Sequence, residues 1–119
     1  MFFIFFVFSI YITYPLILNL DNLTIGKEDT YYLTWILNWN IHSLANNIFD
    51  LFNGNIYYPY ALSLSYSDLH LTSSIIAFLP VIIFKEPILA YSINLVLSFT
   101  LLGFSTYLLI HFLTKSYLP

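Results

Sequence analysis

Three hydrophobic runs and one polar stretch alternate along this chain of 119 residues. The runs cover residues 2–20, 69–84 and 88–113, and none of them contains an acidic residue, a lysine or an arginine. An α-helix rises about 1.5 Å per residue and the hydrocarbon core of a bilayer is about 30 Å thick, so we predict a transmembrane helix from each run. The second run is the shortest, and its Pro80 lacks a backbone donor for the helix.

The polar stretch, residues 21–68, is expected to contain a helix of its own. From Thr30 to Asp50, apolar residues recur three and four positions apart, which is the period of a helix with one apolar face. These apolar residues are Leu33, Leu37, Ile41, Leu44 and Ile48. A second, amphipathic stripe consists of Trp35, Asn38, Trp39, His42 and Asn46. We therefore predict a helix that lies along the membrane surface.

The composition places the chain among membrane proteins. Hydrophobic residues make up 60% of it and charged residues only 8%, whereas soluble domains carry about 25% charged residues. With three basic residues and a net charge of −3, the chain lacks the basic surface that binds nucleic acid. We expect an all-α, multi-pass protein of the cell membrane, with about three transmembrane helices and one interfacial helix in a single membrane-embedded segment, residues 1–119.

Five of the six acidic residues lie in the polar stretch. Asp29 directly precedes the predicted helix, where an aspartate that caps the helix stabilises it by about 1 kcal/mol. Alternatively, Asp29 is a general base at the membrane face or part of a metal site. Asp68 has the same two interpretations at the start of the second run. His42 and His70 are possible ligands, and a structural role is favoured for both.

Two further patterns predict local structure. Asn53, Gly54 and Asn55 predict a tight turn in which Gly54 takes a positive φ. In the third run, small and weakly polar residues recur close to one helical face, which favours helix–helix packing in lipid. These residues are Ala90, Asn94, Ser98 and Ser105.

The order of these signals resembles the N-terminal part of GT-C-type integral membrane glycosyltransferases, most of all the prokaryotic members related to protein mannosyltransferases. The resemblance covers nearly the whole chain. The matching stretches are Tyr14–Leu20, Gly26–Asp29, Leu33–Trp39 with His42, Leu51–Pro59, Leu64–Asp68 and Ala90–Asn94.

The resemblance implies a polytopic enzyme whose first loop, residues 21–68, is extracytoplasmic. Its donor would be a sugar linked to polyprenyl phosphate, and a divalent cation is a possible cofactor. The role of catalytic base falls on Asp29, with Glu28 as its neighbouring substitute and Asp68 as a weaker second acid. The residues expected to bind substrate, or to anchor the loop at the interface, are Trp35, Trp39, His42, Tyr57 and Tyr58.

Enzymes of this type have many more transmembrane helices than three. We therefore expect an N-terminal fragment that is inactive without its C-terminal spans. One alternative is a small non-enzymatic membrane protein that packs against a larger membrane partner through the face of Asn94 and Ser98. Another is a transporter fragment in which Asp29 and Asp68 gate a polar path, although no charged residue lies inside a predicted span.

Overall fold

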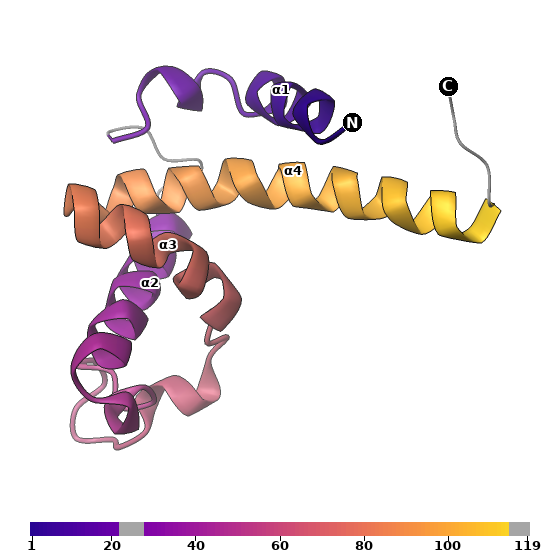
Figure 1. Ribbon diagram of the computed structural model, residues 1–119. Coiled ribbons are helices and arrows are strands. Elements are labelled where there is room, and N and C mark those ends of the chain that lie inside the picture. Colours follow the sequence, from indigo (N-terminus) through magenta and orange to yellow (C-terminus); the bar gives the residue numbers. More distant parts are fainter. Residues whose placement is uncertain (22–27, 115–119) are drawn as a thin grey trace.

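The computed structural model describes residues 1–21 and 28–114, and these residues form helices and no strand. Four α-helices follow one another along the chain (Figure 1), with short 3-10 helices between them. The α-helices are α1 (Phe2–Ile12), α2 (Glu28–Asn46), α3 (Leu71–Phe84) and α4 (Pro87–Thr114). The 3-10 helices are η1 (Leu16–Leu18), η2 (Ile48–Asp50) and η3 (Ser63–Tyr66). The predicted all-α class is confirmed for the described residues.

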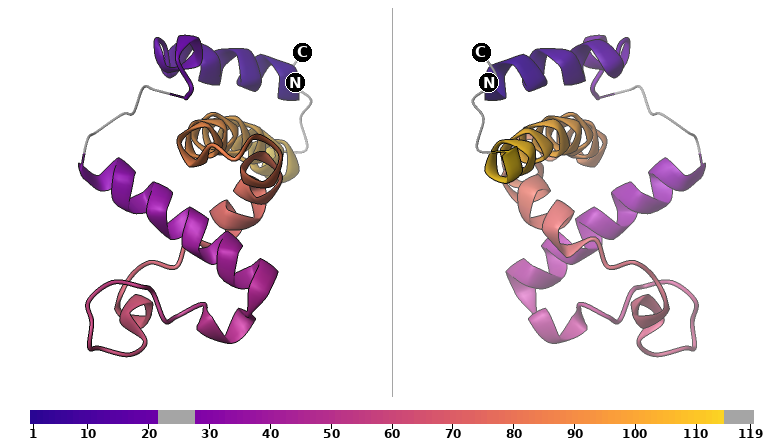
Figure 2. Two further views of the ribbon diagram at one scale, coloured as in Figure 1. Left: turned by 90° about the vertical axis from the view of Figure 1, so that its left-hand side faces the viewer. Right: turned by 90° about the vertical axis from the view of Figure 1, so that its right-hand side faces the viewer.

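Helix α4 is the element around which the other α-helices are arranged. Its 28 residues correspond to about 42 Å at 1.5 Å per residue. Figures 1 and 2 show α1 along one side of α4, and α2 and α3 on the other side. Within the described residues, α4 is the one helix that is long and apolar enough to cross a membrane. The structure therefore contains one candidate transmembrane helix and does not support the three that we predicted.

The first hydrophobic run is not one helix, so the prediction of a continuous helix over residues 2–20 is wrong. Helix α1 ends at Ile12, and the next residue, Thr13, donates its hydroxyl to the carbonyl oxygen of Ser9 at 2.8 Å. Pro15 explains the break, because proline lacks a backbone N–H and disfavours the helical conformation at the residue before it. The 11 residues of α1 reach about 16 Å, roughly half the thickness of a bilayer core.

Helices α1 and α4 pack antiparallel. The rings of Phe2 and Phe104 meet edge to face, with their centroids 5.5 Å apart. The hydroxyls of Ser9 and Thr100 lie 2.7 Å apart in the buried part of the same interface. Ser9 Oγ also donates to the carbonyl oxygen of Phe6 at 2.8 Å. A polar pair thus links two otherwise hydrophobic surfaces.

Helix α3 confirms a helix in the second hydrophobic run, residues 69–84, but it has only 14 residues, about 21 Å. Residues with a left-handed backbone set its ends: His70, with φ 48°, precedes it, and Lys85, with φ 56°, follows it. The backbone N–H of Lys85 donates to the carbonyl oxygen of Val81 at 2.9 Å and closes the last turn. Pro87 then begins α4, so α3 and α4 form a helical hairpin.

The helix that we predicted over residues 30–50 is present as α2, which starts at Glu28 and ends at Asn46. Asn47 interrupts it with an extended backbone, and its side chain accepts the backbone N–H of Phe49 before η2. The apolar face of α2 packs inside the protein. Leu37 and Ile41 are buried there with Ala77 of α3 and Ala90 of α4.

Amide side chains link the helices of the core. Asn40 of α2 is fully buried, and its Nδ2 donates to the carbonyl oxygen of Leu69 and, at 2.9 Å, to Ser74 Oγ. Asn94 of α4 is buried, and its Nδ2 lies 3.4 Å from the carbonyl oxygen of Ser73. The predicted packing face is thus confirmed at Ala90 and Asn94, which are buried, whereas Ser98 and Ser105 are exposed.

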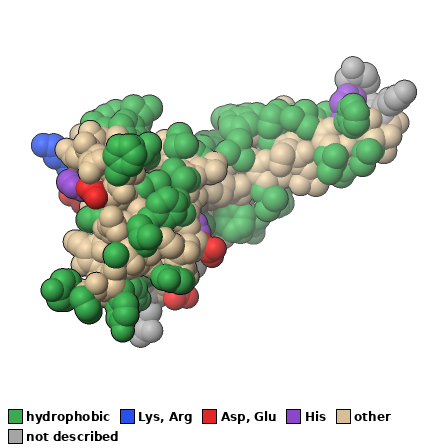
Figure 3. All heavy atoms as spheres, turned by 90° about the horizontal axis from the view of Figure 1, so that it is seen from below, with side chains coloured by type: hydrophobic (Ala, Val, Ile, Leu, Met, Phe, Trp, Pro, Cys, Tyr) green, Lys and Arg blue, Asp and Glu red, His purple; other side chains and the backbone are tan. Residues whose placement is uncertain are grey.

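Hydrophobic side chains cover much of the surface shown in Figure 3. The part of α4 that extends beyond the other helices shows hydrophobic side chains, whereas the visible Lys, Asp and Glu side chains lie on the broader part of the molecule. Exposed residues on that part of α4 include Leu109, Phe112 and Leu113. This surface is suited to lipid or to a hydrophobic protein partner.

Candidate functional site

One face of α2 carries a row of stacked aromatic rings. Trp35 lies between Tyr32 and Trp39, with ring centroids 6.1 Å from each and with interplanar angles of 20° and 18°. The ring of His42 continues the row, 5.8 Å from that of Trp39. These four positions are spaced by three, four and three residues, so an α-helix places them on one face. The row unites three of the five residues that we expected to bind substrate or to anchor the loop, namely Trp35, Trp39 and His42.

An open cleft of about 530 Å³ lies beside this row. Its wall includes Trp35, Trp39 and His42 of α2 and Ile82 of α3. The Nε1 atom of Trp39 is buried and has no hydrogen-bond partner among the described residues. His42 is exposed, and its Nδ1 lies 3.2 Å from Nδ2 of Asn46. The cleft therefore combines an aromatic and aliphatic surface with a few polar atoms.

The segment between α2 and α3 folds back over this row. The backbone N–H of Leu64 donates to the carbonyl oxygen of Phe52 at 3.0 Å, and Asn53 Oδ1 accepts the N–H of Leu62 at 2.9 Å. A Cβ on Gly54 would lie only 2.9 Å from Cη2 of Trp35. The φ of Gly54 is not in the left-handed region, so the predicted positive φ is wrong. Glycine is needed here because the segment approaches Trp35 closely.

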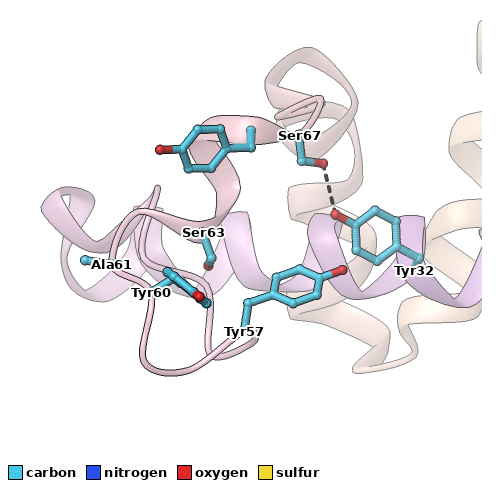
Figure 4. A pocket seen from close by; sticks show the side chains of 7 residues that line it. Tyr32, Tyr57, Tyr60, Ala61, Ser63 and Ser67 are labelled. Carbon is cyan, nitrogen blue, oxygen red and sulfur yellow. Dashed lines mark hydrogen bonds between the residues drawn. The ribbon is translucent and has the colours of Figure 1, made fainter.

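A hydrogen bond joins the aromatic row to the residues before α3. The hydroxyl of Tyr32 lies 2.9 Å from Oγ of Ser67, and Figure 4 shows this bond at the edge of a hollow. The volume of the hollow is about 640 Å³. The residues that line it are Tyr32, Tyr57, Tyr60, Ala61, Ser63, Tyr66 and Ser67. We call it the tyrosine hollow.

The same bond brings the two predicted acidic segments together. Asp29 lies in the first turn of α2, three residues before Tyr32, and Asp68 directly follows Ser67. Both aspartates are exposed. Glu28 is the first residue of α2, whereas Gly26 and Lys27 of the family-like stretch lie outside the described residues. The candidate bases Asp29 and Asp68 are 39 positions apart in sequence, and each lies within three residues of a side chain that lines the tyrosine hollow, although neither aspartate lines it.

Tyr58 does not join this arrangement. It is 96% exposed and does not line the tyrosine hollow. Its neighbour Tyr57 lines the hollow instead, with a φ of 62°. Sequence analysis missed Tyr32 and Tyr60. Tyr32 could have been found, because it extends the spacing of the aromatic row by one turn, but the position of Tyr60 depends on how the loop folds.

The arrangement can support transfer chemistry on a hydroxyl compound. An exposed carboxylate can accept the proton of an attacking hydroxyl, and stacked rings offer flat surfaces for ligands with apolar faces. Within residues 1–21 and 28–114, no three His, Cys, Asp or Glu side chains are grouped so that they could hold a metal ion. Neither a family model, nor a curated protein, nor a solved structure matches this chain.

Proposed function

We propose that this chain is the N-terminal portion of a membrane glycosyltransferase of the GT-C type. It would help to transfer a sugar from a polyprenyl-phosphate-linked donor to an acceptor hydroxyl. The observation that carries the proposal is the hydrogen bond between Tyr32 and Ser67. This bond supports the proposal because it joins Tyr32, the first ring of the aromatic row, to Ser67, and these two residues are three positions from Asp29 and next to Asp68.

The proposed reaction needs a base and a bound donor. A hydroxyl is a weak nucleophile, so a carboxylate that takes its proton lowers the barrier to attack on the sugar. The new bond joins the acceptor oxygen to the anomeric carbon of the sugar, and the bond from that carbon to the phosphate oxygen breaks. The phosphate leaves with the electron pair. Asp29 is the first candidate base, with Glu28 beside it and Asp68 as the second acid.

The membrane arrangement is part of the proposal. Helix α4 would cross the bilayer, since it is long and apolar enough. The shorter helix α3, with 14 residues, would pass through most of the hydrocarbon core beside it, and α1 would enter the core without crossing it. The residues from α2 to His70 would lie at the extracytoplasmic surface, where a lipid-linked donor presents its phosphate. The apolar wall of the cleft beside Trp35 and Trp39 would contact the isoprenoid chain.

Tryptophan fluorescence tests donor binding directly, because Trp35 and Trp39 are the two tryptophans of the chain and both lie in the aromatic row. The chain in lipid nanodiscs is titrated with a short-chain polyprenyl-phosphate mannose. A saturable change in emission, absent with the polyprenol alone, is expected. The variants Trp35→Phe and Trp39→Phe assign the signal to each ring. A non-saturable response, equal for donor and polyprenol, would refute the proposal.

The exposed part of α4 favours a second candidate function. Leu102 and Phe112 are 63% and 77% exposed, and a small non-enzymatic membrane protein could use this surface against a larger membrane partner. Reading the gene beyond codon 119 separates the two functions. Further hydrophobic spans in the same frame support the enzyme, whereas a stop codon supports the small protein.

A further inference from the structure

We propose that the tyrosine hollow is a binding site for a neutral sugar ring. The inference deepens the proposed function and rests on it for the source of the sugar. The binding chemistry itself comes from the residues that line the hollow. The aromatic row and its cleft form a separate surface, and the two share Tyr32.

The dimensions of the hollow fit a small ligand. Its volume of about 640 Å³ lies within the range of roughly 300–1,000 Å³ that is usual for ligand pockets. Its walls come from two parts of the chain, since Tyr32 belongs to α2 and the other lining residues belong to the segment 57–67. Figure 4 shows that Tyr57 extends toward Tyr32 across the hollow.

The chemistry of the walls points to a neutral polyol. Four tyrosines and two serines supply hydroxyls that both donate and accept hydrogen bonds, and the tyrosine rings supply flat apolar surface. None of the described residues that line the hollow is charged. A phosphate would find no cationic partner there, and a metal ion would find no carboxylate. A sugar ring has both hydroxyls and an apolar face, so it matches these walls.

Hydrogen bonds within the chain hold the walls of the hollow in place. Ser67 is fixed to Tyr32, and Ser63 Oγ donates to the carbonyl oxygen of Gly54 at 3.2 Å. The N–H of Tyr60 donates to the carbonyl oxygen of Tyr57 at 3.0 Å. The φ of Tyr57 is 62°, a region that bulky residues rarely occupy unless the surrounding structure enforces it. Ordering before binding lowers the entropy cost of capturing a ligand.

The position of the hollow suits the proposed chemistry. Asp68 directly follows the lining residue Ser67, and Asp29 lies one helical turn before Tyr32. A sugar held between the tyrosines would therefore lie near both segments that carry a candidate base. Tyrosine also provides a large contact area with few rotatable bonds, which is why it is common in binding surfaces.

Saturation-transfer difference NMR on the chain in nanodiscs tests the inference. The probes are neutral disaccharides of glucose, galactose and mannose, with inorganic phosphate as the charged comparison. At least one disaccharide should bind, and Tyr57→Ala and Tyr60→Ala should each weaken its Kd about tenfold, as loss of a central aromatic contact does. Tyr14→Ala is the matched control, because Tyr14 is 65% exposed, as Tyr57 is, and lies outside the hollow.

Two further variants keep the test decisive if the alanine variants fold poorly. Tyr57→Phe and Tyr60→Phe retain the rings and remove only the hydroxyls, and each should weaken the Kd by about threefold to fivefold, which corresponds to a lost neutral hydrogen bond. The inference is overturned if no disaccharide binds. It is equally overturned if binding is unchanged in all four hollow variants, or if phosphate binds and the disaccharides do not.

Competition then identifies the source of the sugar. If short-chain polyprenyl-phosphate mannose displaces the disaccharide, the hollow holds the sugar of the donor. If both bind at once, the hollow holds the acceptor. Either result supports the inference. Disaccharide binding without any donor binding supports it too, while contradicting the proposed glycosyltransferase, so the two failures are distinguishable.

Discussion

The hydroxyl of Tyr32 and Oγ of Ser67, 35 positions apart in sequence, lie 2.9 Å from each other. Through this contact α2 holds the segment that leads into α3. Both residues line the tyrosine hollow (Figure 4), and each lies close in sequence to a candidate catalytic aspartate. The arrangement of the candidate site thus depends on a contact between residues far apart in the chain.

Removing this contact should loosen the hollow with little loss of global stability. The bond is exposed, so Tyr32→Phe should lower the free energy of unfolding by about 0.5 kcal/mol, the low end for a hydrogen bond. Amide hydrogen exchange over residues 63–68 should become faster because this segment loses its link to α2. Tyr31→Phe is the control, since Tyr31 is exposed and does not line the hollow. Equal exchange in both variants would show that the bond does not order the segment.

The role of Asp29 as a base predicts a large effect on sugar transfer. Asp29→Asn, introduced into the gene in its native host, should lower kcat about 100-fold or more in isolated membranes, since general base catalysis contributes roughly 10²–10⁴-fold. The assay follows a labelled sugar from a polyprenyl-phosphate donor to the acceptor. Asp50→Asn is the control, because Asp50 accepts a hydrogen bond from Asn47 at 2.8 Å in η2, away from the hollow. Full activity of Asp29→Asn together with loss in Asp68→Asn would assign the base to Asp68.

Two glycines, Gly54 and Gly103, each lie close to an aromatic side chain, so replacing them by alanine gives two comparable steric variants. Gly54→Ala would place a Cβ 2.9 Å from Cη2 of Trp35, and Gly103→Ala would place one 2.6 Å from Cδ1 of Phe5. Each should lower the free energy of unfolding by about 1–3 kcal/mol, as overpacking does. The tryptophan emission should shift only in Gly54→Ala, because the nearest atom to the new methyl group belongs to Trp35 there and to Phe5 in Gly103→Ala. A shift of the tryptophan emission in both variants would show that the change in emission does not come from the contact between position 54 and Trp35.

The absence of native cysteine allows the proposed topology to be tested with single introduced cysteines. Ser65→Cys and Lys85→Cys replace exposed residues on the two proposed sides of the membrane. A membrane-impermeant maleimide added to intact cells should label Cys at position 65 and leave position 85 unlabelled until the cells are permeabilised. Labelling of both positions in intact cells would rule out the arrangement in which residues 65 and 85 lie on opposite sides of the membrane.

Hydrophobic periodicity was sufficient to predict α2 and part of its packing. Leu37 and Ile41 recur at helical spacing, and both are buried in the core. Hydropathy overestimated the length of the helix in the first hydrophobic run, because it does not register that Pro15 breaks the helix after α1. Length and composition therefore predicted three transmembrane helices, whereas the described residues contain one candidate, α4.

The sequence predicted only the part of the candidate site whose residues lie on one helix. Trp35, Trp39 and His42 share one helical face, so their grouping follows from their spacing along α2. The tyrosine hollow was not predictable in this way, since the position of Tyr60 depends on loop contacts such as that between Leu64 and Phe52. Similarly, the requirement for glycine at position 54 comes from the approach of Trp35 and not from a turn.

The hydroxyl pair of Ser9 and Thr100 joins residues separated by 91 positions, and this separation has a consequence for biosynthesis. At a translation rate of about 5–20 residues per second, α1 waits roughly 5–18 s before its partner surface on α4 is made. During that interval the hydroxyl of Ser9 need not be left without a partner, because it also bonds the carbonyl oxygen of Phe6 within α1. Helix α1 can therefore stay in an apolar environment, with the hydroxyl of Ser9 hydrogen-bonded, until α4 has been synthesised.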